Sequence, residues 1–220
     1  MEYYPVFMNV TARRCVVVGG GEVAARKVES LIEAGADVIV VSPEAVEAIT
    51  ALAAAGRIQW LSRPYRAGDI RGAFLAYAAT DDDELHAAIA ADAKADAVLL
   101  NVVDRPRWCD FIVPSIARRG DLVVAVSTSG RSPAMARRIR QDIELMLTAE
   151  YEAAIALFDR LRRHLVRRGW SFERRREIFD RLLQSDVLSS LRRDDSAEVD
   201  RLLAEHAGES VSTASLEAER

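Results

Sequence analysis

Cysteine is scarce in this chain of 220 residues, which has only Cys15 and Cys109. Two isolated cysteines cannot build a disulfide framework, and His86, His164 and His206 follow no metal-ligand spacing. We therefore expect no resident metal, although the identity of any metal that the protein handles is left unknown. Cys15 is expected to be a small buried thiol in or beside the first strand.

Long hydrophobic runs are also missing, since none approaches the roughly 18 residues that a membrane helix needs. Residues 1–5 show neither the basic nor the apolar segment of a secretion signal. Half of the residues are hydrophobic and 29% are charged, which is typical of a soluble globular protein. We expect a cytoplasmic protein without a membrane partner, and the chain is long enough to bury a core.

Lysine is nearly absent, with Lys27 and Lys94 the two examples, so arginine supplies almost all of the positive charge. Fifteen arginines lie between Arg131 and Arg193, although the net charge of the chain is −4. Such a basic region is compatible with nucleic acid, with a polyanionic ligand or with solvated helices. The pI near 5.5 and the interleaved acidic residues argue against a nucleic-acid partner.

A glycine-rich turn is the most informative feature that is present. It follows the apolar run 15–18, and Gly19, Gly21 and Ala24 fit the G-x-G-x-x-G/A spacing of a dinucleotide-binding turn. Gly19 permits the tight turn, Gly21 lets the backbone approach a pyrophosphate, and Ala24 lets the helix pack close to the strand. The helix N-terminus offers unpaired N–H groups to the phosphates. We predict a Rossmann-type nucleotide site, with an ordinary glycine-rich βα turn as the alternative.

Short apolar runs alternate with longer amphipathic ones through the first half of the chain. This alternation predicts an α/β fold with a doubly wound parallel sheet. Thr80 or Asp81 is expected to cap the third helix, because acidic residues follow them. The expected strands are 15–18, 38–41, 58–61, 74–78 and 98–103, and the expected helices are 23–34, 45–54 and 84–95.

The composition changes after residue 113, which predicts a boundary between domains. A strand is expected at 121–127, followed by a polar turn and by a helix that begins near Pro133 and ends at about 147. The pattern is then helical to about residue 191, with a break at 169–171. Residues 192–220 are polar and are expected to be a disordered tail, with a short helix around 198–206 as an option.

Polar side chains that follow strands are the candidates for chemistry, because open α/β sheets bind ligands beyond the carboxyl ends of their strands. This rule selects residues 19–23, 42–44, 80–82 and 101–104. Asp104 ends the apolar run 98–103, where a carboxylate can serve as a general base near a nicotinamide. Capping a turn before Arg105 is its alternative role.

The cofactor signal after the second strand is mixed. An acidic residue near this position usually binds the ribose hydroxyls of the adenosine. Here Ser42 occupies the expected position and Glu44 lies slightly beyond it, while no arginine stands beside them to bind a 2′-phosphate. The sequence therefore favours NAD over NADP.

Six motifs, in this order, resemble the siroheme synthase N-terminal family of precorrin-2 dehydrogenases, which are often also sirohydrochlorin ferrochelatases. The set is far more specific than the glycine turn alone, above all Asn-Val-Val-Asp followed by Phe-Ile-x-Pro-Ser. It covers residues 3–147 and extends more loosely to about 190. The motifs are Tyr-Pro-Val-Phe at 4–7, the glycine turn at 15–24, Ala-Ala-Thr-Asp-Asp at 78–82, Asn-Val-Val-Asp at 101–104, Phe-Ile-Val-Pro-Ser at 111–115 and Ser-Thr-Ser-Gly-Arg-Ser-Pro at 127–133.

The resemblance implies NAD-dependent oxidation of precorrin-2 to sirohydrochlorin in siroheme biosynthesis, and in some relatives insertion of Fe²⁺ as a substrate. It also implies a homodimer with an NAD-binding Rossmann domain (1–113), a small α/β dimerisation segment (114–147) and a helical domain (148–191), ahead of the tail (192–220). Asp104 matches the family's acid/base residue. The expected cofactor residues are Gly19, Gly21, Glu22, Val23, Pro43, Glu44 and Thr80, and the expected substrate residues are Asn101, Ser127, Thr128, Arg131 and Pro133.

The arginines suit such a substrate, because a tetrapyrrole rich in carboxylates favours the two-point contacts of guanidinium groups. The candidates are Arg118, Arg119, Arg131, Arg137 and Arg138. Two other classes of function stay open at this point. One is a regulatory module that senses a nucleotide without catalysis, and the other is an arginine-rich nucleic-acid binder with a vestigial nucleotide fold.

Overall fold

The computed structural model describes residues 3–208 and 210–218. Two compact units make up the chain, Met1–Val113 and Pro114–Arg220. The division falls where the composition changes, and each unit has a hydrophobic core of its own.

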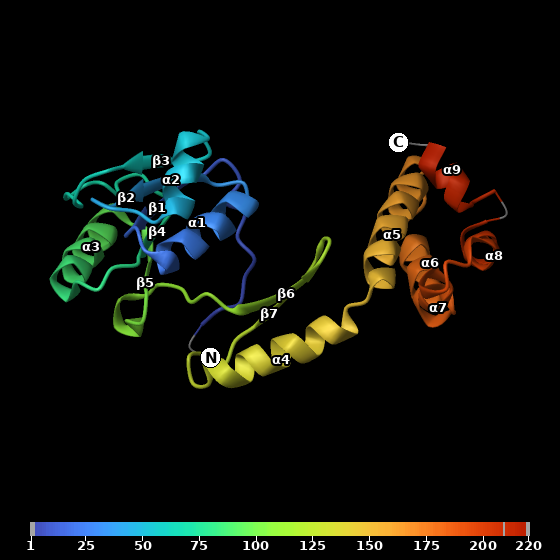
Figure 1. Ribbon diagram of the computed structural model, residues 1–220. Helices are drawn as coiled ribbons and strands as arrows, with labels where there is room; N and C mark the ends of the chain where they lie inside the picture. Colours follow the sequence, from blue (N-terminus) through green and yellow to red (C-terminus); the bar gives the residue numbers. More distant parts are fainter. Residues whose placement is uncertain (1–2, 209, 219–220) are drawn as a thin grey trace. The chain divides into compact units, whose positions relative to one another are not determined.

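The first unit is built on a five-stranded parallel sheet with the order β3-β2-β1-β4-β5 (Figure 1). The order reverses between β1 and β4, and doubly wound sheets bind ligands at such a switch point. The expected Rossmann-type α/β fold is therefore confirmed. The strands are β1 (Arg14–Val18), β2 (Asp37–Val41), β3 (Gln59–Leu61), β4 (Leu75–Ala78) and β5 (Leu99–Val102).

Helices cover both faces of this sheet. The helices α1 (Glu22–Glu33) and α2 (Glu47–Ala54) pack on the face that includes Cys15 and Val17. Helix α3 (Asp83–Asp96) packs on the opposite face, which includes Val16 and Val18. Because both faces are buried, the strands read as continuous apolar runs instead of alternating ones.

The start of α3 differs from the prediction. The cap is Asp82, whose Oδ1 accepts from the backbone N–H groups of Glu84 (2.9 Å) and Leu85 (3.1 Å). The expectation that Thr80 or Asp81 caps this helix is wrong. The hydroxyl of Thr80 lies instead 3.1 Å from Nε2 of His86, at the end of β4.

The second unit begins with an antiparallel hairpin of β6 (Ser115–Arg119) and β7 (Leu122–Val126). Gly120 makes the turn between them with a positive φ of 53°. Helix α4 (Pro133–Met146) packs against the hairpin and is capped by Ser132. Strand β7 and helix α4 were predicted from the sequence, whereas β6 was not.

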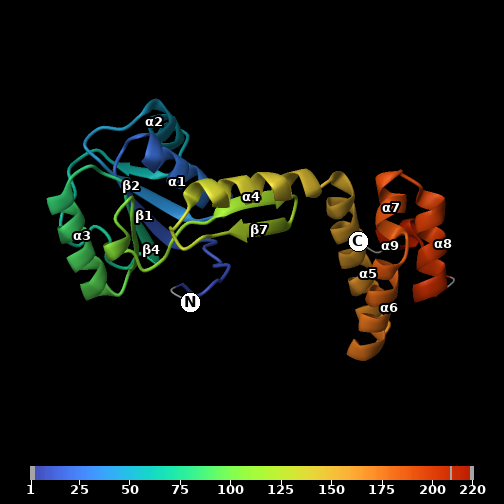
Figure 2. The same cartoon turned by 90° about the horizontal axis from the view of Figure 1, so that it is seen from below.

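Within the described residues, five further helices follow in this unit, and they bury a common core. The expectation of a disordered tail over 192–220 is wrong for the described residues, because α8 and α9 pack beside α5–α7 (Figure 2). Val199, Leu202 and Leu203 form an apolar stripe on α8, and all three are buried. Residues 209 and 219–220 lie outside the described residues. The helices are α5 (Ala149–Arg167), α6 (Phe172–Gln184), α7 (Val187–Arg192), α8 (Ser196–Ala207) and α9 (Thr213–Ala218).

Candidate nucleotide and substrate site

The three glycines between β1 and α1 meet different surroundings. A β-carbon at Gly19 would lie 2.1 Å from the carbonyl oxygen of Ala79, and Gly19 has a φ of +125°. A β-carbon at Gly20 would lie 1.9 Å from the carbonyl oxygen of Glu44, whereas one at Gly21 would meet nothing within 4 Å. Gly19 and Gly20 are therefore needed for packing against neighbouring loops, while Gly21 leaves open space.

The open space over Gly21 fits a phosphate group. Gly21 is the N-cap of α1 without a side-chain cap, so the first backbone N–H groups of the helix, including those of Glu22 and Val23, are available to an anion. Ala24 is completely buried, as close packing of the helix on the strand requires. No role for Gly20 was predicted, and the only signal for one was that the run contains three glycines where the dinucleotide-binding spacing requires two.

The loop after β2 is fixed beside this turn. The N–H of Val46 donates to the carbonyl of Gly20 at 2.8 Å, and the indole N–H of Trp60 donates to the carbonyl of Ser42 at 3.0 Å. The Ser42 hydroxyl donates to the carbonyl of Glu44 at 2.6 Å and is therefore used within the loop. Pro43 and Glu44 are exposed, so the Glu44 side chain is the acid available to a ribose.

Thr80 follows β4, the strand on the other side of β1. Its hydroxyl pairs with His86, whose ring is 1% exposed and packs edge-on against Trp108 with 5.9 Å between ring centroids. Thr80 is adjacent to Ala79, the residue that contacts Gly19. The candidate cofactor residues from three loops are thus brought together at the carboxyl edge of β2, β1 and β4.

Asp104 lies in the loop after β5, at the same edge of the sheet. Its backbone is left-handed, with a φ of 58°, which is uncommon for a residue other than glycine. The loop is joined to β4 through the N–H of Val103, which donates to the carbonyl of Ala78 at 3.0 Å. The guanidinium group of Arg105 pairs with the carboxylate of Asp83, with 2.9 Å between Nε and Oδ1.

Lys27 lies on α1, the helix that begins at the glycine turn, and its ammonium group interacts electrostatically with Asp104. Burial lowers the pKa of the Lys27 ammonium, the charge of Arg26 lowers it further, and the charge of Asp104 opposes the shift. Lys27 also lies over the ring of Tyr77, with 5.6 Å from Nζ to the centroid. Asp104 is therefore within electrostatic range of the helix that would hold a pyrophosphate. The sequence alone did not predict this role of Lys27.

The candidate substrate residue Asn101 is part of the structure of its loop. Its side chain is 8% exposed, and Nδ2 donates to the carbonyl of Phe111 at 2.8 Å. Contact between Asn101 and a substrate stays a prediction.

The other candidate substrate residues form one turn in the second unit. The hydroxyl oxygen of Ser127 accepts from the N–H of Ser129, and that of Thr128 accepts from the N–H of Ser132, each at 3.0 Å. Arg131 donates its N–H to the carbonyl of Thr128 at 3.0 Å, and α4 begins at Pro133. The side chains of the turn therefore hold the backbone that leads into α4.

Three of the five candidate arginines are used within the second unit. Arg118 donates to the carbonyl of Gly120 at 3.1 Å, and Arg119 donates to that of Leu147 at 3.0 Å. Arg138 pairs with Asp142 one turn along α4. Arg131 and Arg137 are exposed, and no side chain within 3–208 and 210–218 pairs with their guanidinium groups.

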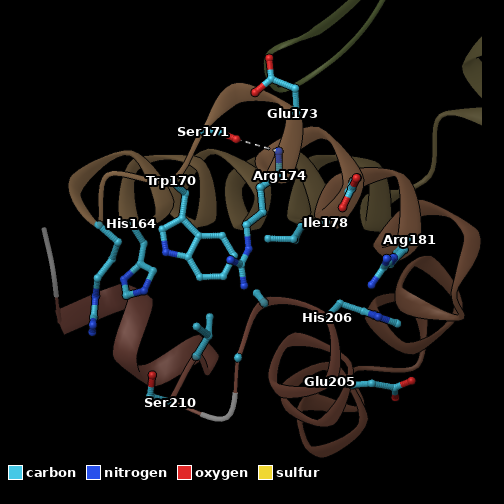
Figure 3. Close-up of a pocket in the computed structure, with 15 residues that line it drawn as sticks. His164, Trp170, Ser171, Glu173, Arg174, Ile178, Arg181, Glu205, His206 and Ser210 are labelled. Carbon is cyan, nitrogen blue, oxygen red and sulfur yellow. Dashed lines mark hydrogen bonds between the residues drawn. The ribbon is translucent and has the colours of Figure 1, made fainter.

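A cavity of about 810 Å³ lies among the helices of the second unit (Figure 3). The guanidinium of Arg174 lies 4.1 Å from the centre of the Trp170 ring, and the N–H of Arg174 donates to Ser171. Charges of both signs line the cavity, including Arg181 and Glu205, so it indicates no single class of ligand.

Neither a metal-ligand cluster nor a membrane-spanning helix is present in the described parts of the chain. No three His, Cys, Asp or Glu side chains of residues 3–208 and 210–218 gather closely enough to hold an ion. Over the same residues, no helix combines the length and the apolar character that a membrane span needs.

Two family models match consecutive parts of the sequence. A family model described as putative NAD(P)-binding matches residues 6–115, and one described as the central part of a sirohaem biosynthesis protein matches residues 119–146. The siroheme synthase of Stutzerimonas stutzeri is 40% identical over 205 residues, which cover 93% of this chain and 44% of that protein. That of Methylobacillus flagellatus is 44% identical over 179 residues, which cover 81% and 38% respectively. The chain thus spans less than half the length of these relatives.

A solved structure described as SirC, precorrin-2 dehydrogenase, has the same fold. It superposes with a TM-score of 0.73 at 23% identity, over 90% of this chain and all of that one. The NAD(P)-binding family model spans half of the chain and includes the glycine turn and Asp104. The chain belongs to the siroheme synthase N-terminal family, and its first unit is an NAD(P)-binding domain.

Proposed function

We propose that this chain catalyses the NAD-dependent dehydrogenation of precorrin-2 to sirohydrochlorin, a step of siroheme biosynthesis. The observation that carries the proposal is the position of Asp104. Its carboxylate follows β5 at the edge of the sheet where the glycine turn lies, within electrostatic range of Lys27 on α1. A nucleotide cradle and a candidate proton acceptor therefore share one edge of the same sheet.

The cradle holds the cofactor through the backbone. Gly21 leaves room for a pyrophosphate, and the N–H groups of Glu22 and Val23 face it at the start of α1. The exposed carboxylate of Glu44 accepts hydrogen bonds from ribose hydroxyls and repels a 2′-phosphate, which favours NAD over NADP. Pro43 and Thr80 flank the cradle on either side.

The reaction removes a hydride and a proton from precorrin-2. Bound NAD⁺ supplies the hydride acceptor. Asp104 accepts the proton at a carboxylate oxygen, which makes it the general base of the reaction. Arg131 and Arg137 bind carboxylates of the tetrapyrrole, because their guanidinium groups have no partner among the described residues and suit two-point contacts.

Residues 114–147 supply the dimer interface. The hairpin and α4 bury few side chains of their own, and they expose large apolar ones: Ile116 is 48% exposed, Met135 54% and Ile139 39%. Apolar side chains gathered on one small element are typical of an interaction surface. We infer that a second copy of this chain covers them, because most soluble oligomers are built from identical chains and two-fold dimers are the commonest of these.

The test uses the purified chain with precorrin-2 and NAD⁺, and it follows NADH and sirohydrochlorin by absorbance. Asp104→Asn should lower kcat by about 10²- to 10⁴-fold while the affinity for NAD⁺ stays within about twofold. The matched control is Asp37→Asn, which changes an exposed aspartate at the amino end of β2, on the opposite edge of the sheet, and should leave kcat unchanged. NAD⁺ binding without turnover by the wild type would favour the nucleotide-sensing module instead.

Iron insertion is a second reaction that the family resemblance implies, and it stays a prediction. Sirohydrochlorin and Fe²⁺ in the absence of NAD⁺ provide the assay, with the uncatalysed insertion rate subtracted. A rate above that background assigns chelatase activity to this chain.

A further inference from the structure

The segment that follows the Asp104 loop turns back and pairs with the end of β5. The N–H of Asp110 donates to the carbonyl of Leu100 at 2.8 Å, and the N–H of Leu100 donates to Oδ2 of Asp110 at 2.9 Å. Nδ2 of Asn101 donates to the carbonyl of Phe111 at 2.8 Å. Since β5 is the edge strand, these bonds occupy polar groups that no further strand pairs.

The thiol of Cys109 makes the corresponding contacts with the next residue of β5 and with the loop. Its sulfur lies 3.2 Å from both the N and the O of Val102, and 3.4 Å from the carbonyl oxygen of Arg105. The sulfur accepts from the Val102 N–H, and the S–H donates to one of the two carbonyls. Val102 precedes Asp104 and Arg105 follows it, so the thiol bridges the two sides of the Asp104 turn.

This bridge requires a thiol that keeps its proton. Burial raises the pKa of the Cys109 thiol, the hydrogen bond from Val102 partly opposes this rise, and the charge of Asp110 adds to it, so the S–H donor persists at neutral pH. A thiolate could accept from Val102 but could not donate to either carbonyl.

The Asp104 turn gains from such support, because a φ of 58° is less favourable for aspartate than for glycine. Within the loop, the N–H of Arg105 donates to the carbonyl of Val102 at 3.2 Å, which is a long hydrogen bond. The contacts of the Cys109 sulfur with Val102 and Arg105 add to this bond and stabilise the left-handed conformation of Asp104. The direction of the Asp104 carboxylate then follows from the backbone.

We propose that Cys109 is the positioning residue for Asp104: its thiol joins Val102 to Arg105 and so fixes the turn from which the carboxylate projects. The inference rests on the proposed role of Asp104 as proton acceptor. In this role Cys109 does not touch the substrate and acts through the backbone alone.

The test is a double-mutant cycle of kcat with Asp104→Asn and Cys109→Ala. Cys109→Ala should lower kcat at least about tenfold with the NAD⁺ affinity within about twofold, because small misplacements of a reacting group are costly. Cys109→Ser should recover part of the loss, since a hydroxyl also donates and accepts. The double variant should have the kcat of Asp104→Asn alone; effects that multiply, or a Cys109→Ala variant as active as wild type, overturn the proposal.

Two further measurements separate positioning from stability and from failure of the proposed function. Cys15→Ala makes the same change at a buried site in β1 of the same unit, and it should lower the melting temperature without a comparable loss of kcat. Hydrogen exchange at the Val102 amide should accelerate at least about tenfold in Cys109→Ala, because this N–H loses its acceptor. A wild type that never forms NADH refutes the proposed function, and unchanged exchange at Val102 refutes the thiol bridge independently.

Discussion

Gly19 and Ala79 join the first βα turn to the end of β4 at a distance that admits no side chain. A β-carbon on Gly19 would lie 2.1 Å from the Ala79 carbonyl oxygen, far inside the contact distance of the two atoms. The obstacle is backbone and cannot rotate away. The two strands at the switch point of the sheet can therefore approach each other only with glycine at this position.

Gly19→Ala is expected to destabilise the first unit strongly. The backbone would have to move away from Ala79, and a φ of +125° would be imposed on a residue with a side chain. We expect a loss of at least about 3 kcal/mol in the free energy of unfolding, measured by urea denaturation followed by circular dichroism. A variant within about 1 kcal/mol of wild type would show that the contact is not a constraint.

Gly21→Ala is expected to separate nucleotide binding from folding. A β-carbon there meets nothing within 4 Å, and the φ of −85° suits alanine, so stability should stay within about 1 kcal/mol of wild type. The methyl group would occupy the space in which we place the pyrophosphate. The affinity for NAD⁺, measured by calorimetry, should fall at least about tenfold, and an unchanged affinity would place the phosphates elsewhere.

The glycine turn could be predicted because the spacing of Gly19, Gly21 and Ala24 is visible in the sequence, and the backbone at Gly19, with a φ of +125°, requires glycine. Strand β6 could not, since Ala117 is its only buried residue among the five and the strand therefore lacks an apolar signal. The helix offered as an option around 198–206 is present as α8, but the packing of the tail was missed, because Val199 and Leu202 are separated by two charged residues and only helical spacing joins them on one face.

The candidate site was predicted to the extent that it follows strand ends. Asp104 and Thr80 could be located because polar residues end apolar runs. Lys27 and Cys109 could not, because their contacts depend on where α1 and the return segment lie in space. Local sequence patterns do not predict such long-range contacts.

Arg63 and Asp69 should make the first unit sensitive to acid. Two parallel hydrogen bonds of 2.8 Å from Arg63 lower the pKa of Asp69 below its ordinary value of 3.8, and the N–H of Arg66 adds a third. A lowered pKa in the folded state stabilises the fold above pH 3.8, and the stabilisation is lost as the pH falls through the lower folded pKa.

Asp69→Asn should therefore cost about 1–3 kcal/mol at pH 7, and the difference from wild type should shrink below pH 3.8, as measured by urea denaturation across a pH series. The control is Asp96→Asn, which removes a single longer contact of 3.3 Å to Arg71, itself 76% exposed. Such surface pairs contribute about 0–1 kcal/mol. A pH-independent cost at Asp69 would mean that its charge is irrelevant to stability.

Met135 and Leu183 offer a test of the dimer, because each is 54% exposed and only Met135 belongs to the segment 114–147. We expect the wild type to sediment as a dimer in analytical ultracentrifugation. Met135→Asp places a charge on the proposed interface and should shift the chain toward the monomer, since an unpaired buried charge costs several kcal/mol. Leu183→Asp makes the same kind of change on α6, in the helical domain, and should leave the dimer intact. Dissociation by both variants, or by neither, would remove the interface from residues 114–147.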